Sequence, residues 1–340
     1  MHGSHARDCQ SCQHEGNVRL EARVTGGTWH QAPGALVSGM TTVAFLGLGA
    51  IGAPMARHLA GPYDLVVWNR TRARADEFAR ATTVRIADSP AGAARGAGVV
   101  ITCLPASPDV ASLLDGDDGL LAGLAPGSVL IDCTSGDPAT SRAIAARLQE
   151  RGVAFLDAPV SGGVKGAEKG VLTVMAGGER AVFERMLPVL GTFGEKIVHC
   201  GPVGAGHALK SVNQALLAVH IWSAAEGLAV LVKAGVSPSL ALDVINASSG
   251  RSNTSQNLIP ERVLTRAFPR TFRLALLDKD VGIAAQVARE HNVPAPIMQL
   301  TAELFRTAHG ILGEEADHVE AVRVVEEWAK TTIADRPGAA

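Results

Sequence analysis

Apolar and polar positions follow two different patterns along the chain. Between residues 43 and 200, short apolar runs are separated by stretches in which apolar residues recur at a helical period. This alternation is typical of βαβ units that build a parallel sheet. The predicted strands cover residues 43–48, 65–68, 99–104, 129–133, 154–159, 172–176 and 197–200.

The second pattern begins after Gly206, where the strand signal stops. Long helical periods cover residues 208–233, 238–247, 276–290, 296–309 and 318–330. We therefore expect an α/β domain of the Rossmann type at residues 40–202, an all-α domain at 203–333 and a tail at 334–340. Residues 1–39, rich in Gly, His, Gln and Ser, show neither period, and we expect a disordered leader or a misassigned start there.

Composition narrows the class of protein. A formal charge of -2 without a basic stripe argues against a nucleic-acid partner. The five cysteines are an odd number, and two of them, Cys103 and Cys133, lie in predicted core strands, which indicates free thiols and a reducing compartment. The Cys9-x-x-Cys12 pair with His14 lacks a second ligand pair, so no metal site is expected. With no secretory pattern and no run of roughly 20 uninterrupted apolar residues, we expect a cytoplasmic protein without membrane association.

A glycine-rich hexapeptide, GLGAIG, follows the first predicted strand at residues 47–52. In the G-x-G-x-x-G pattern, Gly47 permits a tight turn, Gly49 lets the backbone approach a pyrophosphate, and Gly52 allows a helix to pack closely on the strand. A helix starting near Ala50 would direct its free N–H groups at the phosphates. The whole turn is the candidate cofactor site: Gly47, Leu48, Gly49, Ala50, Ile51 and Gly52.

The end of the second predicted strand bears on the choice of cofactor. An NAD site usually has a carboxylate there to hold the ribose 2′-hydroxyl, but the residues here are Trp68, Asn69, Arg70 and Thr71. Arg70 is suited to charge-assisted hydrogen bonds with a 2′-phosphate, although a surface arginine at the start of a helix is the alternative. NADP is therefore favoured, with NAD as the alternative, and Asn69 to Thr71 join the candidate cofactor contacts.

Four separated motifs in this order resemble the β-hydroxyacid dehydrogenase family. They are GLGAIGAPMARHL at 47–59, DAPVSGG at 157–163, GPVGAGHALKSVNQ at 201–214 and LDKD at 277–280. The resemblance implies a fold like that of 6-phosphogluconate dehydrogenase and an NAD(P)-dependent oxidation of a small 3-hydroxy acid, as in 3-hydroxyisobutyrate dehydrogenase. It also implies a homodimer or homotetramer formed through residues after 206, where the helices carry extensive apolar faces.

Lys210 is the candidate catalytic residue. It precedes fifteen residues, 211–225, that carry no formal charge. On a helix, Asn213 and Gln214 follow at i+3 and i+4, on the same face as the lysine. Spacing alone leaves open a lysine that merely reaches for water; the resemblance implies a general acid and base for the reacting oxygen, with Asn213 and Gln214 orienting the substrate.

Further site residues follow a similar logic. Ser161, Gly162 and Gly163 follow a predicted strand, where a turn can offer N–H groups and a hydroxyl to an anion, although a tight loop without a ligand is the alternative. The resemblance implies that this turn holds the substrate carboxylate. The resemblance places Leu104, Pro105 and Ser135 against the cofactor, and Lys279 beside the nicotinamide and substrate.

Three alternatives remain open. Many relatives have Asn where this chain has Gln214, and the residues from 213 onward resemble the threonate dehydrogenase branch, which makes a longer sugar acid a candidate substrate. An imine reductase or a non-catalytic dinucleotide-binding module would share the architecture, but both usually lack the lysine that stands here at 210.

Overall fold

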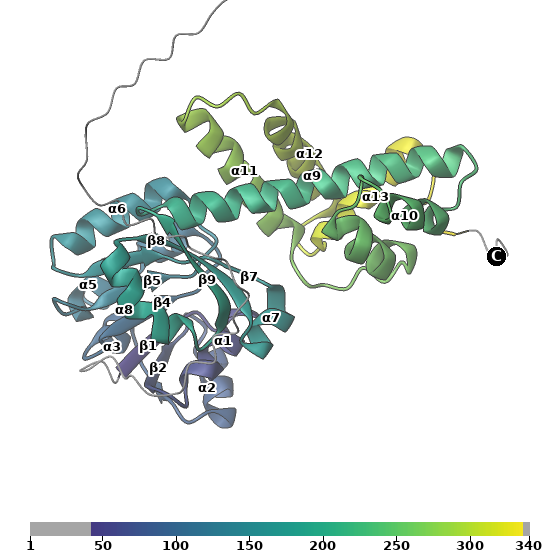
Figure 1. The fold of residues 1–340 in the computed structure, drawn as a ribbon. Helices are drawn as coiled ribbons and strands as arrows, with labels where there is room; N and C mark the ends of the chain where they lie inside the picture. The colour runs from purple at the N-terminus through teal and green to yellow at the C-terminus, as the bar shows by residue number, and fades with distance from the viewer. Residues whose placement is uncertain (1–41, 336–340) are drawn as a thin grey trace, which may run out of the picture. The chain divides into compact units, whose positions relative to one another are not determined.

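The structure is a computed structural model that describes residues 42–335. The leader expected at residues 1–39 and the end of the expected tail, 336–340, lie outside this range, as do Cys9, Cys12 and His14. Figure 1 shows a sheet with its helices in purple to teal, followed in the chain by helices in green to yellow.

Nine strands form one sheet in the order β3-β2-β1-β4-β5-β6-β8-β7, with β9 also paired to β8. Neighbours from β3 to β6 are parallel, β8 runs antiparallel to β6 and β7, and β9 is parallel to β8. The strands are β1 (Thr42–Leu46), β2 (Asp64–Trp68), β3 (Arg85–Ile86), β4 (Val99–Thr102), β5 (Val129–Asp132), β6 (Ala154–Asp157), β7 (Val160–Ser161), β8 (Leu172–Gly178) and β9 (Gly194–Gly201).

Helices cover both faces of this sheet, as the nearly continuous apolar strands require. Alternate residues of β1 enter different cores: Val43 and Phe45 pack in one, Ala44 and Leu46 in the other. The helices are α1 (Gly52–Leu59), α2 (Arg72–Ala81), α3 (Pro90–Ala94), α4 (Ser107–Ser112), α5 (Leu120–Gly123), α6 (Pro138–Gln149), α7 (Gly163–Lys169) and α8 (Arg180–Leu190).

After β9 the described chain is helical, with a core of its own around Trp222 and Phe305. Its elements are α9 (Ala205–Lys233), α10 (Pro238–Asn246), the π-helix η1 (Thr254–Leu264), α11 (Leu274–Glu290), α12 (Pro296–Leu312), the 3₁₀ turn η2 (His318–Glu320) and α13 (Ala321–Ala329). The expected fold class, a Rossmann-type α/β part followed by an all-α part, is confirmed.

Helix α9 is long and apolar enough, by length and composition, to cross a membrane. It packs instead against α11, α12 and α13 (Figure 1). Its side chains Ile221, Trp222 and Leu228 are buried in the helical core. We therefore describe it as a core helix.

The structure departs from the predicted elements in a few places. The first helix begins at Gly52 rather than near Ala50, because Ala50 and Ile51 complete the turn. The strands β3 and β7 were not predicted, since two residues are too few to show an alternation. The helix η1 was also missed, because it contains Pro260 and starts with the polar residues TSQN.

Candidate active site

The glycine-rich turn joins β1 to α1 at the carboxyl end of the sheet. Gly47 has φ +107°, and a Cβ atom there would overlap the carbonyl oxygen of Cys103. A Cβ at Gly52 would overlap the carbonyl oxygen of Gly47, so the helix can approach the turn only without a side chain. No atom of residues 42–335 lies within 4 Å of the corresponding position at Gly49, which leaves the backbone open to an approaching group. The turn thus fits the pyrophosphate of a dinucleotide, with the N-terminus of α1 beside it.

The residues after β2 support this turn. The backbone N–H of Leu48 donates to Oδ1 of Asn69 at 2.9 Å, and Nδ2 of Asn69 donates to the carbonyl of Thr71 at 2.9 Å. Asn69 therefore connects the glycine turn to the end of β2, which lies beside the cofactor's ribose in dinucleotide-binding folds of this type. Arg70 is exposed and lies 3.6 Å from the carboxylate of Asp109 on α4.

The loops after β4 and β5 are joined to each other. The N–H of Leu104 donates to Oγ1 of Thr134 at 3.1 Å, and the N–H of Thr134 donates to Asp132 at 3.0 Å. Leu104, Pro105 and Ser135 follow the ends of the parallel strands β4 and β5, so they lie at the same end of the sheet. Leu104 and Ser135 are half-buried and Pro105 is exposed.

Lys210 lies in the second turn of α9 and is only 7 % exposed. The hydrogen bonds and ion pairs found within residues 42–335 include none from its ammonium group. Burial lowers the pKa of Lys210, and the charge of Lys279 lowers it further, while the carboxylate of Asp280 acts in the opposite direction. A buried lysine without a close counterion is suited to proton transfer near neutral pH.

Lys279 and Asp280, on α11, form an ion pair at 3.0 Å, and the charges of both shift the pKa of Lys210. The ammonium of Lys279 also donates to the carbonyl of Ser135. Asp280 is 2 % exposed, and its Oδ2 is buried with no hydrogen-bond partner in the described part of the chain. The structure thus brings Lys210, Lys279 and the loop after β5 together.

The other predicted substrate residues are placed less closely. Asn213 is exposed and donates to Oε1 of the buried Gln214 at 3.2 Å, and within residues 42–335 neither amide bonds to Lys210. Gly162 and Gly163, with φ +136° and +64°, form an exposed turn from β7 into α7. No hydrogen bond connects that turn to Lys210 in the described range.

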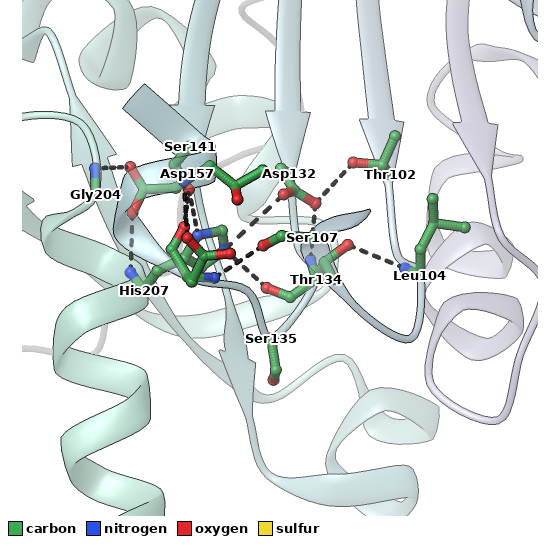
Figure 2. A network of polar contacts seen from close by, with 12 residues as sticks. Thr102, Leu104, Ser107, Asp132, Thr134, Ser135, Ser141, Asp157, Gly204 and His207 are labelled. Atoms are coloured by element: carbon green, nitrogen blue, oxygen red, sulfur yellow. Dashed lines mark hydrogen bonds and ion pairs between the residues drawn. The ribbon is translucent and has the colours of Figure 1, made fainter. Parts of the chain in front are cut away.

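Figure 2 shows a buried polar network where β5 and β6 end and α9 begins. The carboxylate of Asp157, at the end of β6, accepts from the N–H groups of Gly204 and His207 at 2.7 and 2.9 Å. The ring of His207 contacts Ser141 and the carbonyl of Thr134 at 2.6 and 2.8 Å. Burial raises the pKa of Asp157, and the nearby His207 and the donated N–H groups oppose this.

Comparison with known proteins agrees with this geometry. The model of the NAD binding domain of 6-phosphogluconate dehydrogenase matches residues 42–201, and that of the NAD-binding domain of NADP-dependent 3-hydroxyisobutyrate dehydrogenase matches residues 204–325. A 2-(hydroxymethyl)glutarate dehydrogenase of Eubacterium barkeri is 34% identical over 297 residues, 85% of this chain and 95% of the relative. The chain belongs to the β-hydroxyacid dehydrogenase family.

Two further relatives support the assignment of this β-hydroxyacid dehydrogenase. The 3-hydroxyisobutyrate dehydrogenase of Pseudomonas aeruginosa is 38% identical over 272 residues, 78% of this chain and 91% of the relative. A solved structure of the Mycobacterium tuberculosis 3-hydroxyisobutyrate dehydrogenase with L-serine has a TM-score of 0.78 at 32% identity, covering 84% of this chain and 99% of that one. The α/β part of this dehydrogenase is thus a nicotinamide dinucleotide-binding domain.

Sequence reasoning did not single out several buried polar residues of this dehydrogenase. Asp157, His207 and Asp280 all lie inside the motifs quoted above, but Asp132 and Ser141 do not. A charged or polar residue at the end of an apolar strand was the only available signal for Asp132 and Asp157. The partners of these side chains come from distant segments, so their burial is visible only in the fold.

Proposed function

We propose that this chain is an NADP-preferring dehydrogenase that oxidises a small 3-hydroxy acid or reduces the matching semialdehyde or keto acid. The observation that carries the proposal is the environment of Lys210. Its ammonium is buried beside the Lys279–Asp280 pair, and Lys279 reaches the loop after β5 at the cofactor end of the sheet.

The substrate class rests on what the relatives have in common. 2-(Hydroxymethyl)glutarate, 3-hydroxyisobutyrate and L-serine each carry a hydroxyl group on the carbon β to a carboxylate. In this proposal the turn at Ser161, Gly162 and Gly163 holds the carboxylate through N–H groups and a hydroxyl, and Asn213 and Gln214 orient the other end of the substrate.

Lys210 moves the proton. When bound, the nicotinamide supplies the hydride acceptor for oxidation and the donor for reduction. The Nζ atom of Lys210 takes the hydroxyl proton during oxidation and returns it to the carbonyl oxygen during reduction. The positive charge of Lys279 lowers the pKa of Lys210, which favours the neutral amine that can accept a proton.

The preference for NADP rests on Arg70. No carboxylate follows β2, and the exposed guanidinium is free to turn from Asp109 to a 2′-phosphate. We expect Arg70→Ala to weaken NADP binding about 10-fold, the effect of losing one exposed charge-assisted contact of ~1.4 kcal/mol. NAD binding should change little, and fluorescence titration of both cofactors measures the difference. Equal losses for both cofactors would contradict the assignment.

The decisive test is a substrate panel with NAD and NADP on the wild type and Lys210→Ala. The panel contains 3-hydroxyisobutyrate, 2-(hydroxymethyl)glutarate, L-serine, glycerate, threonate and the hydroxybutyrates. We expect one or more to be oxidised, and Lys210→Ala to lower kcat by about 10²-fold or more, as for a lost general base. Lys233→Ala, at the far end of the same helix, is the matched control and should retain full activity.

The panel also separates the rival functions. An imine reductase would reduce cyclic imines with NADPH and leave the hydroxy acids unchanged. A non-catalytic binding module would bind NADP without turning over either class. Full activity in Lys210→Ala would show that the lysine is not the proton carrier.

The same proposal includes assembly and location. Apolar side chains on α9 and α12, including Leu209, Leu216, Ile297 and Leu300, are 46–61 % exposed. Of these, Ile297 lines a groove of about 580 Å³ between α9, α11 and α12, whose lining is mainly apolar. This surface favours a second copy of the chain as its partner, in a cytoplasmic homodimer or homotetramer.

A further inference from the structure

His207 is completely buried where three segments of the chain meet. It belongs to the first turn of α9, and its ring lies against Ser141 of α6 and the loop after β5 (Figure 2). Both ring nitrogens are engaged: Nε2 is 2.8 Å from the carbonyl oxygen of Thr134, and Nδ1 is 2.6 Å from Oγ of Ser141.

The chemistry of these partners distinguishes the two nitrogens. A carbonyl oxygen only accepts, so Nε2 carries a proton and donates it to Thr134. The hydroxyl of Ser141 both donates and accepts, and it also lies 3.0 Å from the carbonyl of Asp137. The Nε2 bond therefore has one fixed direction, whereas the Nδ1 bond can be made in either direction.

The bond to Thr134 connects α9 with the cofactor end of the sheet. The carbonyl of Thr134 lies directly before that of Ser135, which accepts from Lys279 of α11. Consecutive carbonyls of one loop thus hold two helices, one through His207 and the other through Lys279. Lys210 follows His207 by three residues on α9 and lies beside Lys279.

The backbone of the same turn is anchored separately. Asp157 accepts from the N–H groups of Gly204 and His207, which fixes the start of α9 to β6 whatever the side chain at 207. A change in the ring should therefore leave the helix attached while altering its distance from the loop after β5.

We propose that His207 is a positioning residue that sets the distance between Lys210 and the loop after β5 through its Nε2–H bond to the carbonyl of Thr134. The proposal rests on the proton-transfer role of Lys210. Because hydride and proton transfer depend steeply on geometry, a small displacement of α9 lowers kcat far more than it lowers binding.

The test compares two amide substitutions. Glutamine places its amide nitrogen near the position of Nε2 in histidine, whereas asparagine reaches only the position of Nδ1. We expect His207→Gln to keep kcat within about 3-fold of the wild type, and His207→Asn to lower it about 10-fold or more. The KM values for hydroxy acid and NADP should stay within about 3-fold in both variants, because neither binding group is changed.

Ser141→Ala is the second arm and leaves His207 in place. It removes the Nδ1 partner and the hydroxyl's bond to Asp137 but leaves the Nε2 bond to Thr134, so kcat should stay within about 3-fold of the wild type. This arm decides the matter even where His207→Asn fails to fold. A 10-fold loss in Ser141→Ala, or in His207→Gln, would overturn the assignment to the Nε2 bond.

His318 provides the matched control. It is a second buried histidine, hydrogen-bonded to the carbonyl of Phe272 in the helical part of the chain. His318→Gln and His318→Asn measure what a buried histidine contributes through stability alone, and they should leave kcat unchanged. Equal losses of kcat in His207→Gln and His207→Asn, matched by the His318 pair, would show that His207 only packs.

The outcome is separable from that of the proposed function. If the wild type oxidises a hydroxy acid and Lys210→Ala does not, the proposed function stands. Wild-type kcat in His207→Asn would then overturn the positioning role alone. Full activity in Lys210→Ala would remove the function on which the positioning role depends.

Discussion

At the scale of single residues, the candidate site contains three charged side chains, Lys210, Lys279 and Asp280, and two of them form an ion pair. Lys279 and Asp280 form an ion pair, whereas Lys210 makes no ion pair within residues 42–335 and feels the Asp280 carboxylate only as a charge that raises its pKa. Burial and the neighbouring ammonium both favour the neutral amine, which is the form that accepts a proton from an alcohol. The two charges of α11 therefore shift the pKa of Lys210, and Lys279 also connects α11 to the loop after β5.

Removing either of these two charges should shift the pH dependence of the reaction, and the two shifts should have opposite signs. In the proposed mechanism, the rate of alcohol oxidation rises with pH as Lys210 loses its proton. Lys279→Ala removes a positive charge that lowers the pKa of Lys210, so the pKa should rise and the limb should move to higher pH. Asp280→Asn removes the opposing carboxylate, so the limb should move to lower pH. Profiles of kcat against pH at saturating NADP measure both shifts.

Lys233→Ala is the control for these profiles. Its position in the last turn of α9 is exposed, and its removal should leave the limb in place. Shifts in the same direction for Lys279→Ala and Asp280→Asn would contradict the electrostatic account.

The sequence predicts these residues unevenly. Lys210 and Lys279 are visible because each lies in a recognisable motif, and the turn at 161–163 is visible through its glycines. His207 and Asp157 gain meaning only from contacts across 50 positions of the chain. Gln214 is buried and Asn213 is exposed, and the sequence does not predict this difference. Both residues share one face of the helix with Lys210, and their spacing does not determine which side chain a neighbouring element covers.

At the scale of elements, the turn between β1 and α1 contains glycines that are needed for different reasons, some for the fold and one for ligand access. Gly47 and Gly52 have no room for a side chain, because each faces a carbonyl oxygen of the protein itself. Gly49 faces open space and has no positive φ. Its lack of a side chain is therefore not needed for the fold, which leaves the approach of a ligand as the reason.

Substitutions at the two kinds of glycine should consequently fail in different ways. Gly52→Ala forces α1 away from the turn, and we expect it to lower the free energy of unfolding by about 1–3 kcal/mol, as for other overpacked sites. Gly49→Val should leave that free energy unchanged and weaken NADP binding at least about 10-fold, or ~1.4 kcal/mol. Urea unfolding and cofactor titration measure the two quantities. A Gly49→Val protein with unchanged affinity would contradict the assignment of this turn to the pyrophosphate.

Most elements of the fold were predictable because long apolar periods leave few alternatives. All seven predicted strands and five predicted helical regions are present. The exceptions are local: β3 and β7 owe their existence to pairing with β2 and β8, and η1 to packing in the helical core. Tertiary contacts, rather than the residues' own preferences, determine such segments.

At the scale of the whole molecule, the cores of the described chain do not account for all of its large apolar side chains. Many of the exposed ones belong to the helical part, on α9, α10 and α12. Scattered apolar residues are ordinary on a protein surface, but a groove bordered by several of them favours a partner.

We therefore expect Ile297→Asp combined with Leu300→Asp to reduce the molecular mass in solution. Two carboxylates buried against another subunit would be desolvated without partners, a cost that outweighs the contacts that they retain. Light scattering at micromolar concentration should show a dimer or tetramer for the wild type and a smaller species for the variant. Val171→Asp, on the α/β part, is the matched control and should assemble normally. A monomeric wild type would refute the proposed assembly.

The capping of α9 by Asp157 has a consequence for dividing the protein. The family models place their boundary between residues 201 and 204. A fragment cut there would keep the Asp157 carboxylate but lose both N–H groups that donate to it. It would also lose the histidine that covers Thr134. We therefore expect a stable cofactor-binding fragment to include the first turns of α9. The boundary between the family models is then not the place where the chain can be cut into two folded parts.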